Sequence, residues 1–232
     1  MGWLERIFRA TEDENRRVIL SAMPRRPGAS LLDLGCGDGG WTMQVAAAVG
    51  AERVLGVEFI DEFARAARSA GVDVVAGDLG QPLPLADRSV DVVHSNQVIE
   101  HLPNTDAFMR ELARVLKPGG YAVVSTNNLS SWHNIASLAL GWQPTPCHVS
   151  DELIVGNPGN FVEGMESHSR GQTHLRVFTG RALAGLAAHH GLRVDAQLGA
   201  GYYPLPPRPA SALARLDPTH AAFLVQRYEI AP

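Results

Sequence analysis

A run of glycines follows a short apolar segment near the start of the chain. Residues 35–40 read Gly-Cys-Gly-Asp-Gly-Gly, directly after the apolar residues 31–34. Glycine lets the backbone take positive φ angles and approach a ligand closely. The run also matches the G-x-G-x-x-G pattern of dinucleotide-binding turns. A plain glycine turn would fit it too, so the residues that follow decide what the run means.

Acidic residues end the next two predicted strands. Glu58 follows residues 53–57, where a carboxylate can accept hydrogen bonds from both hydroxyls of a ribose. Asp78 follows residues 72–76 and can accept a hydrogen bond from an adenine amino group, with Leu79 beside the ring. Enzymes that use NAD and enzymes that use S-adenosylmethionine (SAM) share the glycine run and the first acid, whereas Asp78 favours SAM.

Two later features also favour SAM over NAD. Asn96 and Gln97 follow the fourth predicted strand, under the glycine turn. Residues 117–120, Lys-Pro-Gly-Gly, then predict a tight turn into the fifth strand.

Strands and helices alternate along the first half of the chain. We expect helices over residues 3–22, 41–49, 62–69, 104–116 and 180–190, and strands over 31–34, 53–57, 72–76, 90–94, 121–126, 192–198 and 220–230. This alternation predicts an α/β fold, with a mostly parallel sheet and helices on both of its faces. Right-handed crossovers place the carboxyl ends of the parallel strands at one edge, where ligands bind.

The chain closely resembles the type-11 methyltransferase family in five strings, which occur in register and in order over residues 30–127: LLDLGCGDGG, GVEF, AGDL, VDVVHSNQVIEHL and ELARVLKPGGYAVVST. The resemblance implies a class I methyltransferase that uses SAM. It also implies a Rossmann-like, doubly wound sheet of seven strands, in which the last strand, over residues 220–230, runs antiparallel.

The resemblance assigns roles to individual residues. In that family the glycine loop holds the methionine part of SAM, the acid after the second strand holds the ribose, and the aspartate after the third strand binds adenine. The expected cofactor-binding residues are therefore Asp33, Gly35, Cys36, Gly37, Glu58, Phe59, Asp78, Leu79, Asn96 and Gln97. We expect Cys36 to pack in the turn as a small residue, because no base is placed beside it.

Two histidines are candidates for a general base, which a hydroxyl acceptor would need. His101 comes just after the fourth predicted strand, at the ligand edge, and His174 precedes the helix over 180–190. A packing or helix-capping role would also explain either residue.

The run from Gln97 to His101 is similar to a Glu-x-x-Glu-His run that holds a metal ion in some relatives, including small-RNA 2′-O-methyltransferases and some quinone-ring O-methyltransferases. Here the first position is a neutral amide, which weakens a divalent site. Glu100 and His101 would also need a further ligand, such as His168 or His174. We therefore expect no metal ion.

Composition and charge limit the class of protein. The net charge is −4 and no basic tail is present, which disfavours nucleic acid as a partner. The apolar runs are too short to span a membrane, and residues 1–10 lack the apolar core of a signal peptide. We expect a cytoplasmic protein whose partner is a small-molecule acceptor, and we leave a homodimer open.

We expect a single methyltransferase domain over residues 1–232. We divide it into an N-terminal helix (1–30), a SAM-binding core (31–127), a variable lid and acceptor segment (128–178), and a C-terminal helix with strands (179–232). Within the third part, residues 141–174 hold many Gly, Pro, Asn and His residues, as functional loops do. The aromatic residues that could wall the acceptor pocket are Trp132, Trp142, Phe161, Tyr202 and Tyr203.

We expect the acceptor to be a hydroxyl group of a sugar or secondary metabolite. Two alternatives remain. A SAM-binding enzyme could catalyse an intramolecular displacement that releases methylthioadenosine, and a protein without activity could keep the fold as a scaffold.

Overall fold

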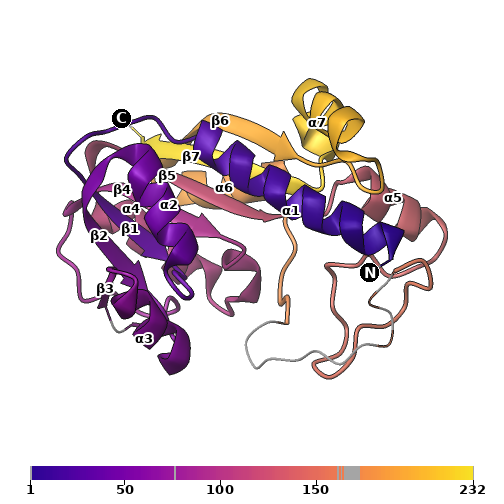
Figure 1. Cartoon of the computed structure of the whole chain (residues 1–232), viewed down its shortest axis with the longest axis horizontal. Coiled ribbons are helices and arrows are strands. Elements are labelled where there is room, and N and C mark those ends of the chain that lie inside the picture. Colours follow the sequence, from indigo (N-terminus) through magenta and orange to yellow (C-terminus); the bar gives the residue numbers. More distant parts are fainter. Residues whose placement is uncertain (1, 76, 161, 163, 165–172, 232) are drawn as a thin grey trace.

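The computed structural model describes residues 2–75, 77–160, 162, 164 and 173–231 (Figure 1). Its α-helices are α1 (Trp3–Ser21), α2 (Gly40–Val49), α3 (Asp61–Ser69), α4 (Thr105–Val115), α5 (Trp132–Ala139), α6 (Gly180–His189) and α7 (Pro207–Leu216). Two 3₁₀ helices are η1 (Ile99–His101) and η2 (Pro218–His220). The strands are β1 (Ala29–Leu34), β2 (Ala51–Val57), β3 (Asp73–Val75), β4 (Val90–Asn96), β5 (Leu116–Asn127), β6 (Leu192–Ala200) and β7 (Phe223–Ile230).

The seven strands form one sheet in the order β3-β2-β1-β4-β5-β7-β6. The pairs from β3 to β5 are parallel, and β7 lies antiparallel between β5 and β6. The predicted fold class is confirmed, including the seven strands and the antiparallel last strand.

Alternating side chains of the central strands serve two hydrophobic cores, one on each face of the sheet. In β1, Leu31 packs with Ile19 of α1 and Val45 of α2. Leu32, its neighbour in sequence, packs with Phe108 of α4 on the other face. Because successive strand residues point to opposite faces, a strand buried on both sides must be apolar throughout, as residues 31–34 are except at Asp33.

Helix α1 is fixed to the rest of the fold along its second half. Glu14 accepts a hydrogen bond from Ser211 Oγ of α7 at 2.6 Å, and Asn15 Nδ2 donates to Asn96 Oδ1 of β4 at 3.0 Å. Ile19 is completely buried against the sheet. The first two turns of α1 extend past the sheet toward α5 (Figure 1).

Some elements differ from those expected. We predicted no helix between residues 199 and 219, where α7 and η2 lie, and η2 delays the start of the last strand from the expected residue 220 to Phe223. The predicted turn at 117–120 belongs to the irregular start of β5, where the pairing with β4 shifts register between Val90 and Val92. None of the described helices combines the length and apolar character needed to cross a membrane.

Candidate active site

The glycine turn leaves β1 at its carboxyl end and crosses the start of η1. Gly35 has φ +86°, and a Cβ atom there would lie 2.5 Å from Cγ2 of Val98. Gly37 has φ +55° and open space where a Cβ would be. Gly35 therefore lets the turn pack closely against Val98. Gly37 leaves the outer side of the turn free for a ligand.

The Glu58 carboxylate faces this turn in a fixed orientation. Its Oε2 accepts the backbone N–H of Gly37 at 2.9 Å, and its Oε1 accepts that of Ile60 at 2.9 Å. Each carboxylate oxygen keeps a further lone pair. The residue is therefore held as a ribose-binding acid would need to be, which fits the cofactor expected from the sequence.

The residues expected around the adenine follow β2 and β3, the strands on the same side of the sheet as Glu58. Asp78 Oδ1 accepts the N–H of Gly80 at 2.8 Å, and Leu79 packs against the main core. Phe59 is 80% exposed, which is unusual for a large aromatic side chain beside a polar turn. An aromatic surface of this kind is available to cover a flat ring.

Asp33 lies beneath the turn and is buried. Its carboxylate accepts hydrogen bonds from Thr42 Oγ1 at 2.6 Å and from His94 Nδ1 at 2.7 Å. Trp41 Nε1 donates to the other nitrogen of His94 at 3.4 Å. In this arrangement Asp33 ties the turn and α2 to the sheet, rather than facing the outer side of the turn.

The sequence analysis missed His94, although one signal could have found it. A histidine inside a buried parallel strand needs a polar partner, and Asp33 occupies the paired register position on β1. Cys36 is buried next to Gly56, and burial raises the pKa of its thiol to about 12. It is therefore packed and unreactive, as its position in the turn suggested.

Beyond β4 the chain makes a strained turn at Gln97, which has φ +55°. Its Oε1 accepts a hydrogen bond from Asn127 Nδ2 at 2.9 Å. Its Nε2 is buried and has no hydrogen-bond partner among the residues that the structure describes. A buried donor without a partner is costly, so a ligand that accepts this hydrogen bond would remove the cost.

Glu100 is completely buried directly after this turn. Its Oε2 accepts a hydrogen bond from Thr126 Oγ1 at 2.8 Å, and its Oε1 accepts one from Asn127 Nδ2 at 3.2 Å. Burial raises the pKa of the Glu100 carboxyl to about 7, against the opposing effect of these hydrogen bonds. Asn127 Nδ2 therefore joins Gln97 to Glu100.

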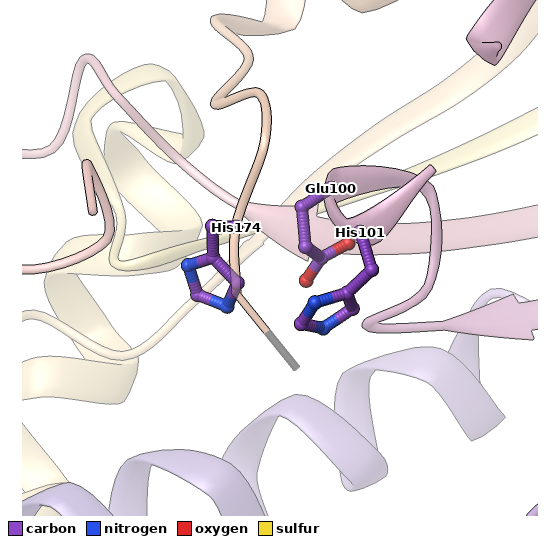
Figure 2. A group of neighbouring side chains, drawn as sticks. All are labelled: Glu100, His101 and His174. Atoms are coloured by element: carbon purple, nitrogen blue, oxygen red, sulfur yellow. The ribbon is translucent and has the colours of Figure 1, made fainter. Parts of the chain in front are cut away.

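His101 and His174 lie beside Glu100, although they come from distant parts of the sequence (Figure 2). The backbone N–H of Leu175 donates to the Glu100 carbonyl oxygen at 2.8 Å, which holds the second segment in place. The two imidazole rings have centroids 4.9 Å apart. The structure therefore brings both candidate bases together with a buried carboxyl group.

Both imidazoles are held in one tautomer by backbone carbonyls. His101 Nδ1 lies 3.2 Å from the carbonyl oxygen of Thr173, and His174 Nδ1 lies 3.0 Å from that of Pro146. A carbonyl oxygen can only accept, so each Nδ1 carries the proton and each Nε2 presents a lone pair. Burial lowers the pKa of both imidazoles, that of His174 to about 4 with a contribution from His101 and His148.

Glu100, His101 and His174 could together hold a divalent metal ion. One potential ligand atom from each lies within 4.8 Å of the others. Carboxylate and imidazole groups suit several transition metals. His168, the other ligand considered from the sequence, lies outside the described residues.

A cavity of about 780 Å³ begins beside this cluster, and we call it the acceptor cavity. Asn127, His148 and His174 line it next to the cluster. Its wall is completed by the first half of α1, by α5 with Leu140, by parts of residues 142–160 with Val162, and by residues around 203 and 222. Its volume is within the range of pockets that enclose drug-sized ligands.

Two of the aromatic residues expected in this wall are present. Trp142 and Tyr203 line the cavity. Trp132 instead stacks on His220 with ring centroids 4.4 Å apart, and Tyr202 is buried against α7. Phe161 lies outside the described residues.

Comparisons with known proteins identify the family and the fold. The family model for a methyltransferase domain matches residues 32–124. A protein of Mycolicibacterium smegmatis, named a probable S-adenosylmethionine-dependent methyltransferase, is 37% identical over 197 residues, which cover 81% of this chain and 72% of that protein. Other curated relatives match 45–54% of this chain, and the chain spans only 24–47% of their lengths.

Solved structures share the whole fold at low sequence identity. The methyltransferase in a complex with the Trm112 activator from Haloferax volcanii matches with a TM-score of 0.64 and 18% identity, over 98% of this chain and 95% of that chain. A [4+2]-cyclase matches with a TM-score of 0.62 and 17% identity, over 94% of this chain and 81% of that chain. The fold, the glycine turn and the bacterial relative agree, and this chain belongs to the class I SAM-dependent methyltransferases.

Proposed function

We propose that this methyltransferase moves the methyl group of SAM to a hydroxyl oxygen of a small molecule, a sugar or secondary metabolite, seated in the acceptor cavity. The position of this cavity carries the proposal. It begins at Asn127 and His174, and Asn127 is hydrogen-bonded to Gln97 at the edge that carries the glycine turn. An acceptor in the cavity would therefore approach the cofactor edge from the side where the histidines lie.

The sulfonium of SAM supplies an electrophilic methyl group, so the chain's main tasks are to bind, orient and exclude water. We propose that the backbone of Gly35 and Gly37 passes along the methionine part of the cofactor. Glu58 accepts hydrogen bonds from the ribose, and Asp78 accepts one from the adenine amino group. Phe59 and Leu79 cover the adenine ring.

Asn96 and Gln97 complete the proposed cofactor contacts. The Gln97 amide supports this role, because it directly follows β4 and its Nε2 has no hydrogen-bond partner among the described residues. Asp33 and Cys36 take part from beneath the turn, where they hold its shape.

One of the two histidines, His101 or His174, receives the hydroxyl proton as the methyl group arrives. Each has a neutral Nε2 with a lone pair, since Nδ1 is engaged by a carbonyl oxygen. His174 also lines the acceptor cavity. The proton would move from the acceptor oxygen to Nε2, and the electron pair of the broken O–H bond would stay on the oxygen that attacks the methyl carbon. S-adenosylhomocysteine would leave with the electron pair of the broken carbon–sulfur bond.

A second candidate function is a SAM-binding enzyme with other chemistry. The similar fold of the [4+2]-cyclase supports keeping it, because that protein has another activity on the same fold. Intramolecular displacement would release methylthioadenosine, whereas methyl transfer releases S-adenosylhomocysteine.

Product analysis tests the proposal. Purified protein is incubated with SAM and a panel of hydroxylated small molecules, and the products are separated by mass spectrometry. We expect S-adenosylhomocysteine with an acceptor heavier by one methylene unit, and we expect at least about tenfold less of both products from Glu58→Ala at limiting SAM, as the loss of roughly 1.5–3 kcal/mol in cofactor binding implies. Methylthioadenosine as the main product would replace methyl transfer with the displacement reaction, and no response to SAM at all would favour a scaffold.

A further inference from the structure

The acceptor cavity is walled mainly by apolar side chains. They come from segments far apart in the sequence: Leu4, Phe8, Leu140, Trp142, Ile154 and Phe223. Polar side chains lie between them: Asn127, His148 and His174 at the end next to the cluster, and Thr11, His133, Ser137, Thr145, Asn157 and Asn160 elsewhere. The large side chains of the wall are therefore mostly apolar, and a charged patch lies on α1.

The charged patch on α1 is partly neutralised within the protein. Arg9 forms an ion pair with Glu5, with Nη2 and Oε1 separated by 3.2 Å. Both residues line the cavity, as does Glu12. Arg9 and Glu12 are exposed and Glu5 is half-buried, so an acceptor can lie against the apolar part of the wall while these charges keep contact with solvent.

Large apolar side chains of the wall are left in contact with solvent. Leu140 is 61% exposed and Trp142 is 37% exposed, and both line the cavity. Exposed apolar surface gathered around a hollow marks a binding site for an apolar partner.

A free sugar fits such a wall poorly. It carries a hydroxyl on almost every carbon, and each one that leaves water without a new hydrogen bond costs free energy. Ser137 and His133 of α5 are already engaged within the protein, Ser137 with the His133 carbonyl oxygen and Asn157, and His133 with Ser131. The large apolar side chains of the wall, such as Leu140, Trp142 and Ile154, offer no such bonds. An apolar body would gain from the same burial.

We propose that the acceptor is a hydrophobic alcohol or phenol of drug-like size, with its hydroxyl at the Asn127–His174 end and its apolar body against α1, α5 and Trp142. This rests on the proposed function for the direction in which the hydroxyl points. The binding of an apolar body stands independently of the methyl transfer. The sequence analysis expected a hydroxyl of a sugar or of a secondary metabolite, and this proposal favours the secondary metabolite.

A fluorescent apolar probe tests the cavity directly. The environment-sensitive dye 1-N-phenylnaphthylamine is titrated into the protein with S-adenosylhomocysteine present, and bound dye is competed with 2-naphthol, 1-decanol or glucose. We expect saturable binding that 2-naphthol or 1-decanol reverses and that glucose leaves unchanged. Displacement by glucose, or no saturable binding, would overturn the proposal.

Two variants of one helix show whether the dye occupies this cavity. Ala136 lines the cavity on α5, and Ala139 lies on the same helix outside its lining. Ala136→Trp fills part of the cavity, so we expect the dye's Kd to rise about tenfold or more, as steric filling of an apolar pocket implies. Ala139→Trp is the matched control and should change Kd by less than about twofold. Equal effects of the two substitutions would place the dye elsewhere and overturn the proposal.

Thermal shift with S-adenosylhomocysteine accompanies each variant. An unchanged shift shows that the cofactor half is folded, so a lost dye signal in Ala136→Trp reports on the cavity. Dye binding as expected, together with methylthioadenosine as the product, would refute the methyl transfer and leave the class of ligand standing. Methylation of sugars by a protein that does not bind the dye would support the methyl transfer and refute the hydrophobic class of acceptor.

Discussion

Replacing His174 by glutamine removes one proposed base and changes the cavity wall little. The imidazole is held by the Pro146 carbonyl at 3.0 Å and stacks on His148, with ring centroids 4.5 Å apart. Glutamine is polar and of similar length, but it cannot take up a proton near neutral pH. The substitution therefore separates proton transfer from acceptor binding.

The size of the effect follows from the environment of the imidazole. General-base catalysis supplies roughly 10²–10⁴-fold, and most when the base has a pKa near the working pH. Burial lowers the pKa of His174 to about 4, so the residue is a weak base and we expect the lower figure. The loss in kcat is then about 10²-fold, or about 2.7 kcal/mol of activation free energy.

The rate should rise with pH as His174 loses its proton. Only the neutral imidazole accepts a proton, so kcat/KM rises with pH until His174 has lost its own proton. Because its pKa is about 4, that limb lies in the acid range and the rate is flat with respect to this group from pH 6 to 8. An unperturbed histidine would instead place the limb near 6.5.

Initial rates of S-adenosylhomocysteine formation between pH 4 and 9 measure the effect, and calorimetry checks that cofactor affinity is unchanged. His101→Gln and the double variant show which ring carries the role. Wild-type turnover in all three variants would refute a histidine base. Loss of turnover on adding EDTA would instead mean that Glu100, His101 and His174 act as metal ligands.

Three further outcomes can be measured separately. Glu58→Ala should weaken binding of S-adenosylhomocysteine by roughly 1.5–3 kcal/mol in calorimetry, because the ribose loses an ionised acceptor. Asp78→Ala should weaken it by only about 1 kcal/mol. An affinity of Glu58→Ala equal to that of the wild type would mean that the ribose binds elsewhere. The raised pKa of Glu100 means that its contribution to stability is present below pH 4.5 and is lost as pH rises to about 7. Denaturant unfolding of Glu100→Gln should therefore show less loss between pH 5 and 8, by up to roughly 3 kcal/mol, and identical pH dependence would mean that the carboxyl is solvated. Hydrogen exchange over residues 141–160 should slow when an acceptor binds, since this segment lines the cavity; strong protection already in the free protein would argue against a lid.

The cofactor half was predictable because its signals are local. A strand buried on both faces, a glycine turn and an acid at the next strand end are each signalled within a few residues. The parallel pairing of β1 with β2 and of β2 with β3 brings their carboxyl ends to one edge, as expected. The pairing of Asp33 with His94 depends on register between β1 and β4, which hydrophobic pattern alone does not give.

The other half depended on contacts between distant segments. His174 meets His101 because Leu175 and Arg176 donate hydrogen bonds to the Glu100 carbonyl oxygen and the Thr173 carbonyl oxygen accepts one from His101. The acceptor cavity joins several segments that share no sequence pattern. Helix α7 was missed because it begins among prolines, which suggest a loop although proline is well suited to the first turn of a helix.

Helix α1 contacts the sheet and the acceptor cavity at once. From Glu14 onward it is bonded to α7 and β4, while Leu4 and Phe8 on its first turns form part of the cavity wall. Ile7 and Thr11 on the same turns are buried, and Thr11 lies against Gly201. The packing of these turns therefore sets where Leu4 and Phe8 stand in the wall. A substitution at Ile7, which does not line the cavity, would change the shape of the space offered to an acceptor.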